Sequence, residues 1–70
     1  MDKNDIINIT RKINQNLSHE NKINDDMIDN IIHSIEYQIE KNKELEFKKC
    51  LENELMKNNC YELARQIIKI

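Results

Sequence analysis

Apolar residues between positions 25 and 41 recur at intervals of three and four, the spacing that places side chains on one face of an α-helix. The repeat comprises Met27, Ile28, Ile31, Ile32, Ile35 and Ile39. These positions span about 140° of a helical wheel, and the opposite side carries Asp29, His33, Glu36 and Glu40. No segment shows a useful length of the two-residue alternation of a strand. The sequence therefore predicts an all-α fold, with residues 25–41 as its clearest helix.

Three further segments carry helical periodicity, at about residues 5–17, 43–57 and 60–70. Asn4 or Asp5 can cap the first segment, and the cluster at 24–26 can cap the helix at 25–41, because such side chains accept backbone N–H groups. Ile23, in the polar loop before that helix, is expected to fold inward. The sequence predicts one domain over residues 1–70, a small bundle of three to four helices.

Beyond Asn42 the apolar face rotates onto a new stripe. The stripe comprises Phe47, Cys50, Leu51 and Leu55. We expect a break near Asn42, since Asn tolerates the left-handed conformation that ends helices; one long helix over 25–57 with two buried faces is the alternative. Asn59 and Glu62 resemble a capping box for the last helix. The apolar residues of that helix are Leu63, Ala64, Ile67, Ile68 and Ile70.

The composition excludes several classes of function. With no Gly, the chain lacks phosphate-binding loops, dinucleotide fingerprints and nucleophile elbows. The balance of 11 basic and 13 acidic side chains, a net charge of −2, gives no support to a nucleic-acid partner. The first ten residues do not have the pattern of a signal peptide, and no apolar run approaches about 20 residues. We therefore expect an intracellular protein without membrane contact. The excess of Ile, Asn and Lys points to an AT-rich genome.

Few residues suit catalysis or metal binding. The weak candidates for metal ligands are Asp29, His33, Glu36 and Glu40. Carboxylate and imidazole groups are plausible ligands, but these four share one helix face, so a solvated face is the favoured interpretation. Cys50 is expected in the core, and Cys60 near a helix start, where a thiolate could be stabilised. We expect no cofactor, no small-molecule substrate and no enzymatic activity; a metal-dependent or regulatory nucleic-acid protein is the competing hypothesis.

Apolar stripes on every predicted helix exceed what a chain of this length readily buries, so we expect docking on another protein or on a second copy. The candidate contact residues are Ile28, Ile32, Tyr37, Phe47, Leu51, Leu55 and Tyr61. The predicted function is a non-enzymatic helical interaction module, which means an adaptor, an assembly subunit or an inhibitor. A self-sufficient bundle whose isoleucine excess reflects codon bias stays open as the alternative.

An acidic face over residues 29–40 would instead suit a phage or viral inhibitor of a host nucleic-acid-processing system, of the anti-CRISPR type, since carboxylates can stand where phosphates would lie. The segment KINDDMIDNIIHSI resembles the beginning of the long central helix of histone-fold proteins, which implies a handshake dimer with Glu62 as its acidic clamp residue. The segment IEKNKELEFKKCLENELMKNNCYE resembles the helical hairpin of ENY2/Sus1 adaptors, with Asn42 and Asn59 in place of glycines. Each resemblance implies a subunit of a larger complex.

Overall fold

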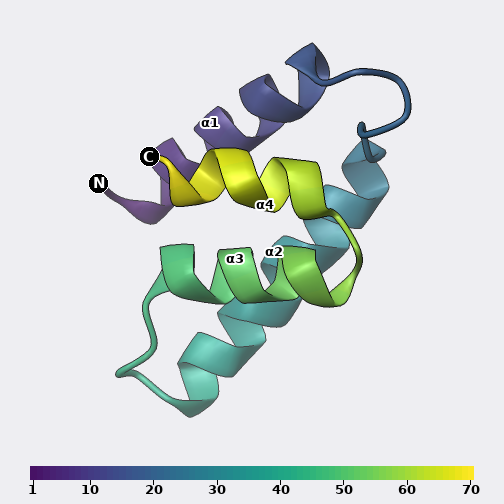
Figure 1. Cartoon of the computed structure of the whole chain (residues 1–70). Coiled ribbons are helices and arrows are strands. Elements are labelled where there is room, and N and C mark those ends of the chain that lie inside the picture. Colours follow the sequence, from purple (N-terminus) through teal and green to yellow (C-terminus); the bar gives the residue numbers. More distant parts are fainter.

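Four α-helices and no strands make up the chain in the computed structural model, which describes residues 1–70. The helices are α1 (Lys3–Asn16), α2 (Asp25–Lys41), α3 (Phe47–Lys57) and α4 (Tyr61–Ile68). Figure 1 shows α3 next to α4, with α1 along the other side of α4 and α2 crossing α3. The prediction of a small all-α bundle is confirmed. None of these helices has the length and apolar content that a bilayer crossing requires.

Helix α1 begins earlier than the sequence analysis predicts, because Asp2 caps it rather than Asn4 or Asp5. The backbone of Asp2 is extended, and its carboxylate accepts the backbone N–H of Asp5 at 2.9 Å. A carboxylate at this position satisfies one of the free N–H groups of the first turn and complements the positive end of the helix dipole. The first helical turn is therefore completed by a residue upstream of the predicted start.

The side chain of Asn14 fixes the loop that joins α1 to α2. Its Oδ1 accepts the backbone N–H of Ile23 at 3.0 Å, and its Nδ2 donates to the carbonyl of Ile23 at 2.7 Å. Asn14 is buried, and a buried amide requires partners of this kind. We call this pair of hydrogen bonds the Asn14 clamp. The clamp holds Ile23 against the core, as the sequence analysis expects of that residue.

The start and end of α2 follow the sequence prediction. Asn24 is the N-cap, and its side-chain oxygen accepts the backbone N–H of Met27 at 2.8 Å. The helix ends at Lys41, so the predicted break near Asn42 is confirmed. Because α2 has only 17 residues, the long central helix that the histone-fold resemblance implies is not formed.

Helix α3 begins at Phe47, and the prediction of a start at residue 43 is wrong. Asn42 itself is extended, with φ −139°, and does not adopt the left-handed conformation expected of it. Its side-chain oxygen accepts the N–H of Glu44 at 3.1 Å, and its carbonyl accepts the N–H of Leu45 at 3.2 Å. These bonds commit residues 42–45 to a turn, since an Asn side chain competes with helical hydrogen bonding. The helix can start only after this turn.

The turn between α3 and α4 depends on Asn59, the single non-glycine residue with a positive φ, at 63°. The N–H of Asn59 donates to the carbonyl of Met56 at 3.1 Å, and the N–H of Cys60 donates to the carbonyl of Leu55 at 2.8 Å. Two such bonds around a left-handed residue form a Schellman motif. The predicted capping box of Asn59 with Glu62 is therefore wrong: Asn59 closes α3, and α4 begins without a side-chain cap.

Ten buried residues form one apolar cluster at the centre of the molecule. They are Ile6, Ile31, Ile35, Cys50, Leu51, Leu55, Cys60, Leu63, Ala64 and Ile67. Six of them belong to α3 and α4, whereas α1 supplies only Ile6. The core is therefore built on the α3–α4 pair, with α2 packed against α3 and α1 packed against α4.

Candidate functional site

The residues predicted to contact a partner divide into a buried and an exposed group. The buried ones are Ile28, Ile32, Leu51 and Leu55, which lie in the interior of the chain. Phe47 is half-buried against the core. Tyr37 and Tyr61 are 62% and 57% exposed. Among the predicted contact residues, only the two tyrosines present a large surface to an approaching protein.

The acidic stripe of α2 is engaged by α1. Arg11 donates a hydrogen bond from Nη2 to Oδ1 of Asp29, and Nζ of Lys3 lies 2.7 Å from Oε2 of Glu36. The other two candidate metal ligands on this stripe are exposed. No group of three or more His, Cys, Asp or Glu side chains in the chain is placed so that it could hold a metal ion. The stripe therefore acts first as an attachment surface for α1.

The ion pair with Lys3 changes the acidity of Glu36. The hydrogen bond from Lys3 lowers the pKa of this carboxyl group; burial opposes the shift, and the charges of Lys3 and His33 add to it. An inhibitor that mimics phosphates needs carboxylates that a basic partner can reach. Since two of the three carboxylates on the stripe already face a basic residue of α1, no observation favours the acidic-face hypothesis, which stays a prediction.

Neither cysteine has the surroundings of a catalytic thiol. Cys50 is buried in the core, as expected, and Cys60 is buried at the cap position of α4. Burial raises the pKa of both thiols, and the charge of Glu54 raises that of Cys50 further. The Sγ atom of Cys60 lies 3.9 Å from the Sδ atom of Met27. A buried thiol that stays protonated at neutral pH is a poor nucleophile, so both cysteines are best understood as core residues.

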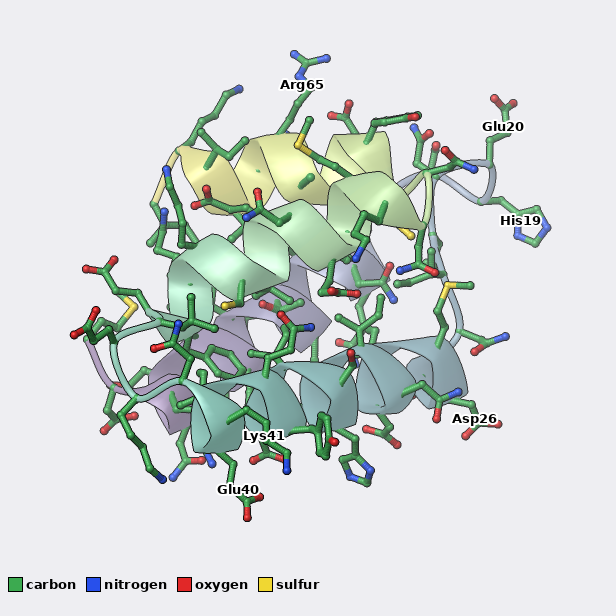
Figure 2. All side chains as sticks on the ribbon, turned by 90° about the horizontal axis from the view of Figure 1, so that it is seen from below. His19, Glu20, Asp26, Glu40, Lys41 and Arg65 are labelled. Carbon is green, nitrogen blue, oxygen red and sulfur yellow. The ribbon has the colours of Figure 1, made fainter.

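An exposed surface with mixed apolar and basic character lies on α4. Tyr61, Arg65 and Ile68 are four and three residues apart, so their side chains share one side of the helix. All three are exposed, and Figure 2 shows Arg65 projecting from α4 away from the rest of the molecule. Nη1 of Arg65 lies 3.4 Å from Oε2 of Glu62. We call Tyr61, Arg65 and Ile68 the α4 outer face.

The periodicity of α4 does not single out Ile68 as an exposed residue. The sequence pattern places it in the apolar stripe, but the structure buries Leu63, Ala64 and Ile67 and leaves Ile68 50% exposed. Leu63, Ala64 and Ile67 occupy the side of α4 that faces the neighbouring helices. Ile68 lies outside the arc of the helical wheel that these three residues span. The signal that could have found this surface is the seven-residue spacing between Tyr61 and Ile68, which is two helical turns.

No protein-family model, no curated protein and no solved structure is significantly similar to this chain. The residues and their geometry are therefore the basis for a proposed function.

Proposed function

We propose that the chain is a small non-enzymatic protein-interaction module that docks on a partner protein through the α4 outer face. The observation that supports this most is that Tyr61 and Ile68 are both at least half exposed on the same side of α4, with Arg65 between them. Tyr and Arg are enriched among the residues that dominate interface energies. Full burial of a large apolar side chain that starts in water contributes roughly 1.5–3 kcal/mol, so covering a side chain that is half exposed contributes about half as much.

Tyr37 is the other exposed tyrosine, but its neighbours on α2 are polar. The amino group of Lys41 lies 5.2 Å from the centre of the Tyr37 ring. One turn earlier, His33 is also exposed. An aromatic side chain flanked by cationic and polar groups offers one apolar contact, whereas the α4 outer face offers two. This difference favours docking on α4.

The test replaces the two apolar residues of the face by alanine, as Tyr61→Ala with Ile68→Ala. Both side chains are exposed, and substitutions at such positions change stability by about 0.5 kcal/mol or less. Wild type and variant are immobilised and exposed to a lysate of the cell of origin, and retained proteins are quantified by mass spectrometry. We expect a partner that is retained by the wild type and lost by the double variant.

Tyr37→Ala is the matched control, because it removes an equally exposed tyrosine from a different helix. Retention of the same partner by this control supports docking on α4. Equal retention by wild type and the double variant would contradict the proposal, and loss with the Tyr37→Ala control alone would place docking on α2. Sedimentation of the wild type at increasing concentration identifies a second copy as the partner if the mass rises and the double variant stays monomeric.

A further inference from the structure

A groove between α2 and the C-terminal end of α3 lies outside the α4 outer face. Its volume is about 510 Å³, within the range of about 300–1,000 Å³ that is usual for binding pockets. It is lined by Asn24, Asp26, Met27, Asn30, Ile31, Ser34, Glu54 and Asn58. Past one end of the groove the two helices are joined by a hydrogen bond, from Nε2 of Gln38 to Oε1 of Glu54 at 2.8 Å. We infer that this groove binds an extended peptide segment in which a basic side chain stands next to an apolar one.

The charge of the groove supports a cationic group in the ligand. Asp26 and Glu54 are its only charged lining residues, and both are acidic. Figure 2 shows Asp26 projecting outward from the N-terminal end of α2, at the outer edge of the residues that line the groove.

Two nearby positive groups are already compensated. The N-terminus of α2 carries a partial positive charge, but Asn24 caps it and Asp25 lies in the first turn. Nζ of Lys57 lies 3.5 Å from Oε1 of Glu54, but this lysine does not line the groove and its side chain is 73% exposed. Because the lysine stands in solvent, it gains little from this contact, although the side chain of Glu54 is only 13% exposed. A basic side chain of a ligand can therefore take its place.

The uncharged lining residues suit an extended backbone with an apolar side chain beside the cation. Met27 is 37% exposed and gives the groove its apolar surface, whereas Ile31 beneath the groove is buried. The flexible thioether of Met adapts to different apolar shapes. Asn30, Ser34 and Asn58 bring amide and hydroxyl groups that both donate and accept hydrogen bonds. A peptide backbone has alternating donors and acceptors, which such side chains can satisfy.

The experiment titrates the ¹⁵N-labelled full chain with the acetylated, amidated pentapeptide Ala-Leu-Arg-Leu-Ala. We expect saturable NMR shifts of the side-chain amide signals of Asn30 and Asn58. One comparison peptide carries Glu in place of Arg and another carries Ser in place of both Leu. We expect both to bind more weakly than the first peptide. Asp26→Asn combined with Glu54→Gln is expected to weaken binding of the arginine peptide by about tenfold, because the two carboxylates that attract the arginine lose their charge.

Glu20→Gln combined with Glu40→Gln is the matched control, because it removes two carboxylates that Figure 2 shows projecting away from the molecule. Unchanged affinity of this control supports the groove. Equal weakening by both double variants would overturn the proposal, since it would show attraction to net charge alone. Absence of saturable shifts at millimolar peptide would also overturn it. Because the groove and the α4 outer face are separate, either proposal can fail without the other.

Discussion

Helices α3 and α4 turn mainly leucine, isoleucine and other apolar side chains toward the interior, whereas α1 turns one isoleucine, one threonine and one asparagine inward. The threonine, Thr10, is satisfied within its own helix, since its hydroxyl donates to the carbonyl of Ile6 at 2.7 Å. The Asn14 clamp, three ion pairs to α2 and the half-buried Ile13, which packs against the core, supply further attachments of α1. Apolar packing depends on buried area and little on direction, whereas these polar contacts depend on geometry, pH and salt. The attachment of α1 can therefore be weakened separately from the α3–α4 pair.

Removing a leucine from the α3–α4 pair tests the apolar half of this comparison most severely. Leu55 is 1% exposed, and Leu55→Ala is expected to lower the free energy of unfolding by about 2–5 kcal/mol, because it leaves a cavity in the core. Urea unfolding followed by circular dichroism measures the loss. Met56→Ala, at an exposed neighbouring position, is the control and should change stability by about 0.5 kcal/mol or less. A loss at Leu55 no larger than at Met56 would show that the pair is not the stabilising centre.

Breaking the clamp tests the polar half. Asn14→Ala leaves the N–H and carbonyl of Ile23 without their partners, which is expected to lower stability by about 1–3 kcal/mol. Hydrogen exchange should accelerate in α1 more than in α3 and α4, because the lost contacts join α1 to the α1–α2 loop and involve neither α3 nor α4. Asn16→Ala, at an exposed position of the same helix, is the matched control. Uniform acceleration across all four helices would contradict the independence of α1.

The comparison between regions can be sharpened at two asparagines, one in the turn that joins α3 to α4 and one at the end of α2. Asn59→Gly should raise the free energy of unfolding by about 0.5 kcal/mol, because glycine adopts a positive φ without a steric penalty. The hydrogen bond that it removes, from the Tyr61 hydroxyl to Oδ1 of Asn59 at 2.9 Å, is exposed to solvent and contributes little. Asn42→Gly should lower the free energy of unfolding by a similar amount, about 0.5–1 kcal/mol, since Asn42 is extended and its side chain accepts the N–H of Glu44. Thermal unfolding of the two variants gives the comparison. Changes of the same sign would show that the two asparagines do not have the different roles described.

The smallest expected effect concerns pH. Because the pKa of Glu36 is lowered in the folded chain, the folded state binds fewer protons at this site than the unfolded state, whose reference pKa is 4.5. The contribution is fully present above that value and is lost as the pH falls through the folded pKa. Both partners are more than 40% exposed on the side chain, so we expect only about 0.2–0.5 kcal/mol. Glu36→Gln should remove this part of the acid dependence, whereas Glu40→Gln should retain it, measured by urea unfolding between neutral and acidic pH.

Local pattern was sufficient to predict the helices but not all of their ends. Helix α2 was predicted with its bounds because its periodicity is strong and Asn24 stands directly before it. The start of α3 could not be read in the same way. The helical spacing continues backward from Phe47, but a side-chain hydrogen bond of Asn42 commits the preceding residues to a turn. An asparagine can cap, bend or end a helix, and the choice depends on the three-dimensional path of the chain.

The candidate site shows a different limit. An apolar stripe that faces a helix of the same chain has the same spacing as one that faces a partner, so Leu51 and Leu55 could not be recognised as interior residues from sequence alone. Whether Ile68 is exposed depends on how much of the surface of α4 the other helices cover. The Asn14 clamp was not foreseen, because it joins a helix to a loop backbone and has no repeating signature.

The short range of the Asn14 clamp has a consequence for assembly. The bonded residues are nine positions apart in the sequence, and closing a loop of this length carries a small entropic penalty. Helix α1 therefore docks on its own chain faster than α1 of a neighbouring chain can take its place. This proximity protects the protein from domain swapping, the exchange of an identical segment between copies, even though α1 is its least firmly attached element.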